Sequence, residues 1–133
     1  MKNIKKSYIR YSLSLNQSRH IIRLGCFGIK SLSFGILNKN QLISIERSLI
    51  QKIKSFNIKS FKVWNLLLLN LNLTKLSSES RMGKGKGSVY TQAAYIKPGM
   101  ILFEFQGLTR QQMCEVFKFI KKKVSFNIIL IKR

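Results

Sequence analysis

Apolar residues at helical spacing follow an N-terminal capping signal at two places in the chain. At the first, Asn38 can cap a helix, Gln41 can reach back to its backbone, and Leu37 and Leu42 bracket the cap as a hydrophobic staple. The apolar residues that share one face of this helix are Leu42, Ile45, Leu49 and Ile53. The pattern predicts a helix that begins after Asn38 and ends between residues 55 and 57.

The same arrangement returns near the C-terminus. Thr109 takes the cap position, Gln112 the third helical position, and Leu108 and Met113 form the staple. The predicted apolar face consists of Met113, Val116, Phe117, Ile120 and Val124. The lysines late in this helix suit its dipole and form either a solvated surface or an RNA contact; they are Lys118, Lys121, Lys122 and Lys123.

Strand-like apolar runs lie around the two helices. They cover residues 28–37, 60–64, 89–96, 100–105 and 124–131. Pro98 followed by Gly99 is typical of a turn, so we expect the two runs that flank it to pair as a hairpin. Two helices among five or six strands predict an α+β fold, with the helices packed on mixed or antiparallel strands, rather than a parallel α/β sheet.

The charge of the chain limits what it can bind. Its 133 residues suit one domain, 45% of them are hydrophobic, and 25 Lys and Arg face 4 acids, which gives a net charge of +21. The acids are Glu46, Glu79, Glu104 and Glu115. Such a charge repels itself unless a polyanion neutralises it. Nucleic acid is the first candidate partner, and an anionic membrane is the second.

The same composition argues against several other functions. With one His, no Asp and four scattered Glu, the chain lacks the close acid–base groups of an enzyme. Cys26 and Cys114 belong to no Cys/His cluster, so we expect no metal site and no cofactor. The apolar run 63–73 is too short to span a bilayer and contains three Asn, so we expect no membrane insertion. Its part from residue 65 to 73, NLLLLNLNL, is either a fully buried strand or a surface that a neighbouring protein covers.

The N-terminal residues are basic and contain no acid before Glu46. They carry Lys5, Lys6, Arg10, Arg19 and Arg23, with Tyr8 and Tyr11 between them. A basic and aromatic strip suits an extended arm on nucleic acid, and a solvated terminus is the plainer alternative. A mitochondrial transit peptide has a similar composition.

Residues 81–88, RMGKGKGS, alternate three glycines with two lysines behind an arginine. The spacing fits neither a Walker loop, in which Ser or Thr follows GK directly, nor the dinucleotide pattern GxGxxG. Glycine lets a backbone approach a phosphate or sugar closely, while Arg81, Lys84 and Lys86 supply positive charge. The segment predicts a loop that enters folded RNA, with a purely solvated loop as the alternative.

This loop and its flanks together resemble the L-sixteen family of large-subunit ribosomal proteins. The matching residues are Thr74, Lys75, Glu79, Arg81 to Gly87, Lys97 to Gly99, Phe103, Glu104 and Gly107, together with Phe27, Gly28 and the first predicted helix. The resemblance covers about residues 24–133, and the motif is specific in this context. The chain departs from the family pattern at Gln92, near which a tryptophan is usual, and in a less basic N-terminal arm.

The resemblance implies a structural ribosomal protein without enzymatic activity. It implies a single α/β-hammerhead-like domain over residues 24–133 and a basic rRNA-binding arm over residues 1–23. Members of the family bind large-subunit rRNA below the central protuberance, support aminoacyl-site tRNA positioning, and join late in subunit assembly. The implied partners are large-subunit rRNA, aminoacyl-site tRNA and neighbouring ribosomal proteins, and no homo-oligomer is expected.

The predicted RNA contacts combine this loop with basic residues elsewhere. They are Lys75, Arg81, Met82, Gly83, Lys84, Gly85, Lys86 and Gly87, with Lys5, Lys6, Arg10, Arg19, Arg23 and Lys30.

Two other functions explain the charge but not the loop. One is a general nucleic-acid-binding protein of an organelle nucleoid, and the other is a basic membrane-associated protein. Residues with A/T-rich codons dominate the chain, which carries 18 Lys against 7 Arg. This bias indicates an organellar gene, and we favour a mitochondrion over a plastid.

Overall fold

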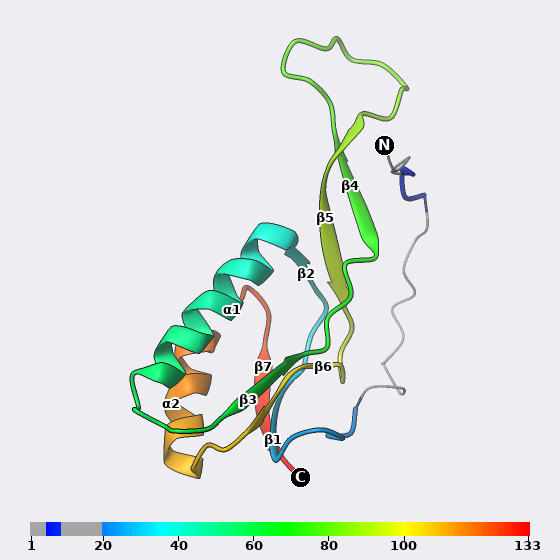
Figure 1. Cartoon of the computed structure of the whole chain (residues 1–133). Coiled ribbons are helices and arrows are strands. Elements are labelled where there is room, and N and C mark those ends of the chain that lie inside the picture. The colour runs from blue at the N-terminus through cyan, green and yellow to red at the C-terminus, as the bar shows by residue number, and fades with distance from the viewer. Residues whose placement is uncertain (1–4, 9–19) are drawn as a thin grey trace.

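The computed structural model describes residues 5–8 and 20–133, which form two antiparallel sheets and two helices (Figure 1). The elements in chain order are β1 (Phe27–Ser31), β2 (Gly35–Asn38), α1 (Lys39–Lys54), β3 (Lys62–Asn65), β4 (Leu71–Lys75), β5 (Ser88–Ile96), β6 (Ile101–Gln106), α2 (Arg110–Lys121) and β7 (Ile128–Lys132). The four-stranded sheet has the order β3-β6-β1-β7, and the three-stranded sheet has the order β2-β5-β4. This arrangement confirms the predicted α+β class.

Both helices begin at the predicted caps. Gln41 Oε1 accepts a hydrogen bond from the backbone N–H of Asn38 at 3.0 Å. In the second helix, Gln112 Oε1 accepts from the N–H of Thr109 at 3.0 Å, and Thr109 Oγ1 accepts from the N–H of Gln112 at 3.4 Å. These bonds satisfy backbone donors that a helix N-terminus otherwise leaves without partners.

The second helix ends earlier than predicted. The N–H groups of Lys123 and Val124 both donate to the carbonyl of Ile120, at 2.8 and 3.2 Å, and this tight turn closes α2. Val124 therefore lies beyond the helix and is half-buried rather than part of its apolar face. The buried residues of α2 are Met113, Val116 and Ile120.

The apolar run 28–37 forms two strands instead of one. It breaks between Ser31 and Gly35, where Leu32 and Phe34 are exposed, and β1 and β2 belong to different sheets. A Cβ at Gly35 would lie 2.5 Å from the ring of Phe126, so the entry into β2 passes too close to this ring for any side chain. The imperfect alternation of the run reflects this change of sheet.

The predicted hairpin at residues 97–99 is wrong, although the turn itself is present. Gly99 has a φ of 86°, and the N–H of Met100 donates to the carbonyl of Lys97 at 3.2 Å. However, β5 lies between β2 and β4, whereas β6 lies between β3 and β1. The N–H of Gly99 donates to the carbonyl of Ser31 at 2.8 Å, and the N–H of Ser31 donates to the carbonyl of Met100 at 2.9 Å. The chain thus crosses between the two sheets twice at one corner.

The hydrophobic core lies between the helices and the four-stranded sheet. Both helices lie side by side on one face of this sheet (Figure 1). The core includes Leu42, Ile45, Leu49, Ile53, Met113, Val116, Ile120, Phe27, Ile29, Phe103, Phe105 and Ile128. Within the described ranges, neither helix is long and apolar enough to cross a bilayer.

The apolar run 63–73 is not one buried strand. Strand β3 ends at Asn65, β4 begins at Leu71, and the connection between them carries Leu67, which is buried, and Leu68, which is 62% exposed. The interpretation as a fully buried strand is therefore wrong. Cover by a neighbouring protein stays a prediction for Leu68.

Candidate nucleic-acid interface

A stem formed by β4 and β5 projects from the body and carries the loop of residues 76–87 at its free end (Figure 1). The two strands pair from Leu71 with Ala93 to Lys75 with Ser88, with a register shift between Leu73 and Thr74. All residues from 76 to 86 are exposed. The predicted contacts of the loop therefore lie together at the end of the stem, with Lys75 at its base.

The three glycines of the loop have different surroundings. A Cβ at Gly87 would lie 2.3 Å from the carbonyl oxygen of Lys75, so glycine is required for the strands to close at the loop base. A Cβ at Gly85 would meet nothing within 4 Å, and one at Gly83 would meet only the carbonyl oxygen of Arg81, at 4.0 Å. Neither of these two glycines has a positive φ. The described part of the chain therefore gives no packing reason for these two glycines.

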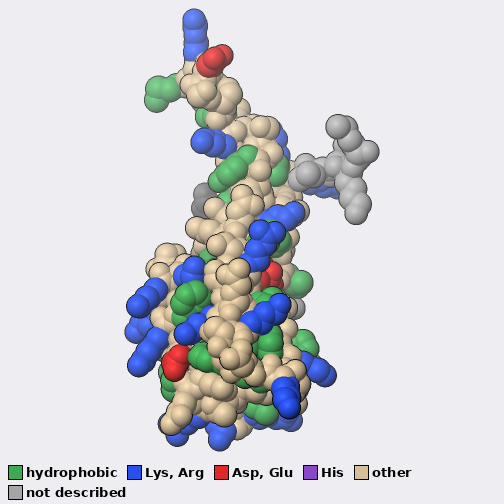
Figure 2. All heavy atoms as spheres, turned by 60° about the vertical axis from the view of Figure 1, so that its left-hand side comes forward, with side chains coloured by type: hydrophobic (Ala, Val, Ile, Leu, Met, Phe, Trp, Pro, Cys, Tyr) green, Lys and Arg blue, Asp and Glu red, His purple; other side chains and the backbone are tan. Residues whose placement is uncertain are grey.

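The stem and loop present positive charge to solvent. Figure 2 shows Lys and Arg side chains along the stem and over the body, with few acidic side chains between them. Arg81 and Lys84 are exposed, and neither side chain makes a hydrogen bond or ion pair with any residue in the described ranges. These two cations are therefore available to an external anion.

Residues 5–8 lie against the stem near its loop. The side chain of Asn72 donates to the carbonyl of Lys5 at 2.7 Å, and its backbone N–H donates to Ser7 Oγ at 3.1 Å. Lys6 Nζ donates to the carbonyl of Lys86 at 2.8 Å. Lys86 Nζ in turn donates to the carbonyl of Ser7 and lies 3.8 Å from the ring centroid of Tyr8. The structure thus brings Lys5 and Lys6 to the stem and its loop, as one basic surface.

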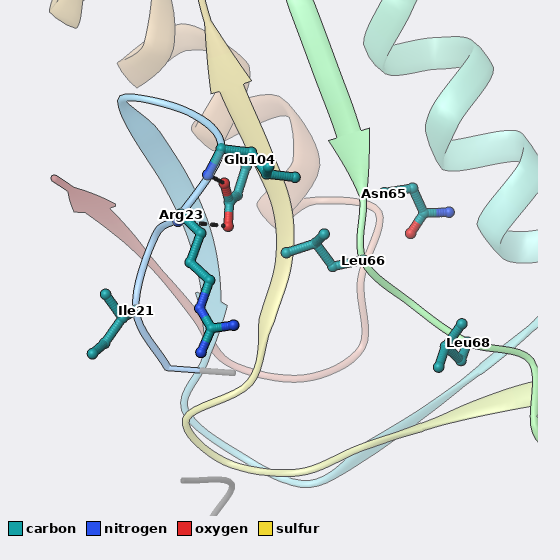
Figure 3. A pocket seen from close by; sticks show the side chains of 7 residues that line it. Ile21, Arg23, Asn65, Leu66, Leu68 and Glu104 are labelled. Carbon is teal, nitrogen blue, oxygen red and sulfur yellow. Dashed lines mark hydrogen bonds between the residues drawn. The ribbon is translucent and has the colours of Figure 1, made fainter. Parts of the chain in front are cut away.

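The other predicted basic contacts lie elsewhere. Arg23 and Lys30 belong to the body, and Lys30 Nζ donates to the carbonyl of His20 at 3.1 Å. Arg23 lines an open cavity of about 380 Å³, where Figure 3 shows its side chain beside Ile21, with Leu66 opposite. The predictions for Arg10 and Arg19 fall outside the described residues.

Glu104 is a positioning residue that the sequence did not reveal. It is 1% exposed, and its carboxylate accepts from the backbone N–H groups of Arg23 at 3.3 Å and Leu24 at 2.7 Å (Figure 3). It also accepts from the N–H of Gly25 at 2.9 Å. These bonds hold residues 23–25, which lead into β1, against β6, an inner strand of the four-stranded sheet. A single acid within an apolar strand is the signal that could have indicated a buried partner.

Asn72 is a second residue of this kind. It lies within the apolar run 63–73 and joins β4 to residues 5–8 through both its side chain and its backbone. Its signal was a polar residue between Leu71 and Leu73, but no local pattern in the sequence identified its partners. Among the described residues, no group of three or more His, Cys, Asp or Glu could hold a metal ion.

The family model for ribosomal protein L16p/L10e matches residues 1–131. The chain belongs to this family. It is 43% identical to the large ribosomal subunit protein uL16m of Chondrus crispus over 131 residues, which cover 97% of the chain and 95% of that protein. It is 32% identical to the large ribosomal subunit proteins uL16 of Psychrobacter arcticus and Psychrobacter cryohalolentis over 112 residues, 84% of the chain and 79% of each relative.

Membership of the L16p/L10e family confirms the resemblance and gives the chain a structural role in the ribosome. The match also begins at residue 1, so it takes in the N-terminal residues as well as those from 24 onwards that carry the resemblance. The loop of residues 76–87 and residues 5–8 are therefore both parts of a ribosomal protein.

Proposed function

We propose that this chain is a structural protein of the large subunit of the mitochondrial ribosome, in which the loop of residues 76–87 enters folded rRNA. The observation that carries the proposal is the pair Gly83 and Gly85 around Lys84, because their Cβ positions face open space in an exposed, cationic loop. The large-subunit relatives support the assignment, and the uL16m protein of Chondrus crispus supports the mitochondrial type.

The chemistry of the loop suits RNA phosphates. Lys84 is a compact point charge, and Arg81 is a planar donor for two oxygens at once. Glycines on both sides of Lys84 let the backbone come close enough for its N–H groups to donate as well. The structure of the loop thus combines side-chain charge with backbone donors over a few residues.

The proposal includes the domain bounds, the further rRNA contacts, the role in translation and the localisation. Residues 24–133 form the domain and residues 1–23 the arm, with Lys5, Lys6, Lys75, Arg23 and Lys30 as further rRNA contacts. The loop supports aminoacyl-site tRNA positioning and late subunit assembly, and neighbouring ribosomal proteins cover apolar surface such as Leu68. The protein acts in the mitochondrial matrix, without enzymatic activity, and a plastid is less favoured.

Binding to transcribed large-subunit rRNA at several salt concentrations tests this proposal. Lys84→Ala should reduce the slope of log affinity against log salt by about 0.9, because one phosphate contact is lost. Gly85→Val should lower affinity about tenfold, equivalent to about 1.4 kcal/mol, while thermal unfolding of the free protein stays unchanged.

Ser125→Val is the matched control, since it adds the same branched side chain at an exposed position of the body and should bind as the wild type. Wild-type binding by both loop variants would contradict the proposed role of the loop. Equal affinity of the wild type for duplex DNA of the same length would favour a general nucleic-acid-binding protein instead.

A further inference from the structure

Lys84 and Lys86 are two residues apart in the same loop, yet their surroundings differ. The ammonium of Lys84 makes no polar contact within the described ranges, whereas that of Lys86 bonds the carbonyl of Ser7 and lies over the ring of Tyr8. A lysine has three N–H donors and a single charge; Lys86 directs one donor to Ser7 and its charge to the ring of Tyr8, in a segment almost eighty residues away in sequence. The geometry therefore indicates that the two lysines have different roles.

The contacts of Lys86 belong to a network of hydrogen bonds that joins residues 5–8 to both β4 and the loop. Lys6 Nζ donates back to the carbonyl of Lys86, so residues 6–8 and Lys86 are joined in both directions. Asn72 adds two hydrogen bonds from the opposite end of the segment, to Lys5 and Ser7. The segment lies along part of β4, an edge strand of the three-stranded sheet, and Ser7 Oγ accepts from the N–H of Asn72 on this edge.

The position of Lys86 in the loop makes it a suitable anchor. It directly precedes Gly87, whose backbone lies against Lys75, so the backbone at Lys86 is held by the closing point of the stem. Lys84 lies further out, between two glycines that touch little else. The end of the loop next to the stem thus carries the lysine with intramolecular contacts, and the outer part carries the lysine that makes none with residues 5–8 and 20–133.

We propose that Lys86 is a positioning residue, which ties residues 5–8 to the base of the loop and acts through Ser7 and Tyr8 rather than through a phosphate. In this arrangement Lys5 and Lys6 are presented beside Lys75 as a preformed basic surface. The inference rests on the proposed rRNA-binding function for its purpose, but the tie itself is a property of the free protein.

Hydrogen exchange of the backbone N–H of Asn72, measured in the free full chain, tests without RNA whether Lys86 holds residues 5–8 in place. This amide donates to Ser7 Oγ, so its exchange reports whether residues 5–8 are in place. Lys86→Ala should speed its exchange by roughly two- to fivefold, the factor that corresponds to loss of an exposed cation–π contact. Lys84→Ala removes the same charge from the same loop and should leave exchange at Asn72 unchanged. Equal exchange in the two variants would overturn the proposal.

A double-mutant cycle on rRNA binding tests how Lys86 acts. Tyr8→Ala should add little to the loss of affinity caused by Lys86→Ala, because both remove the same tie, whereas the losses from Tyr8→Ala and Lys84→Ala should multiply. Multiplying losses for Lys86 and Tyr8 would show that Lys86 meets the RNA directly and would refute the proposal. Failure of the wild-type chain to bind large-subunit rRNA would instead refute the proposed function, and the exchange experiment would still decide the tie.

Discussion

Replacement of Glu104 should destabilise the protein by an amount set by its three backbone donors. The carboxylate is buried and accepts from Arg23, Leu24 and Gly25, of which the last two share Oε2. In Glu104→Gln the carboxamide oxygen can keep those two bonds, but its NH₂ group then faces the N–H of Arg23. Because one charge-assisted bond is lost and two donors meet, we expect a loss of about 1.5–3 kcal/mol in unfolding free energy.

Glu104→Ala should cost more, since all three N–H groups lose their acceptor. We expect a loss of about 3–5 kcal/mol, the range of substitutions that break a buried polar network. Alanine should destabilise the protein more than glutamine because it leaves more backbone N–H donors without a partner.

Urea unfolding of the purified full chain at high salt is the suitable assay, because salt screens the repulsion of the +21 charge. The slope of free energy against urea should stay constant while the midpoint falls. Glu79→Gln, at an exposed position of the loop, is the control and should stay within about 0.5 kcal/mol of the wild type. A Glu104→Gln variant as stable as the wild type would refute the view that this carboxylate holds residues 23–25.

Two further predictions concern stability. Gly87→Ala should destabilise the stem, because its Cβ would lie 2.3 Å from the Lys75 carbonyl oxygen, whereas Gly83→Ala should leave thermal unfolding unchanged; equal melting temperatures would contradict this difference. Thr109→Ala should lower the free energy of unfolding by about 1 kcal/mol, since the N–H of Gln112 loses its capping acceptor. Denaturant unfolding of both Thr109→Ala and Thr109→Ser, which keeps the hydroxyl, would show whether the cap is responsible.

The helices could be predicted from the sequence because their signals are local. The caps at Asn38 and Thr109 and the apolar spacing behind them lie within one or two turns, and the structure confirms both starts. The pairing of strands could not be predicted in the same way. Pro98 and Gly99 do form a turn, but the amide of Gly99 bonds Ser31, far away in sequence, and this contact sends β5 and β6 into different sheets.

In the candidate interface, too, the features with local sequence signals could be predicted and those that depend on long-range contacts could not. The composition of residues 81–87 was enough to predict an exposed cationic loop, because charge and glycine content are properties of the segment itself. The different surroundings of Lys84 and Lys86 could not be predicted, since they depend on where residues 5–8 lie in space. For the same reason the partners of Glu104 became evident only from the fold.

Ala93, Ala94 and Ile96 bury the inner end of β5 in the body, so the length of the β4–β5 stem beyond them sets how far the loop projects from the body. Two residues added to each strand would keep every side chain on its present face and carry the tip about 7 Å further, whereas one residue added to each would invert the faces. The projection of the loop can therefore change only in steps of two residues per strand if each strand is to keep its inner and outer faces.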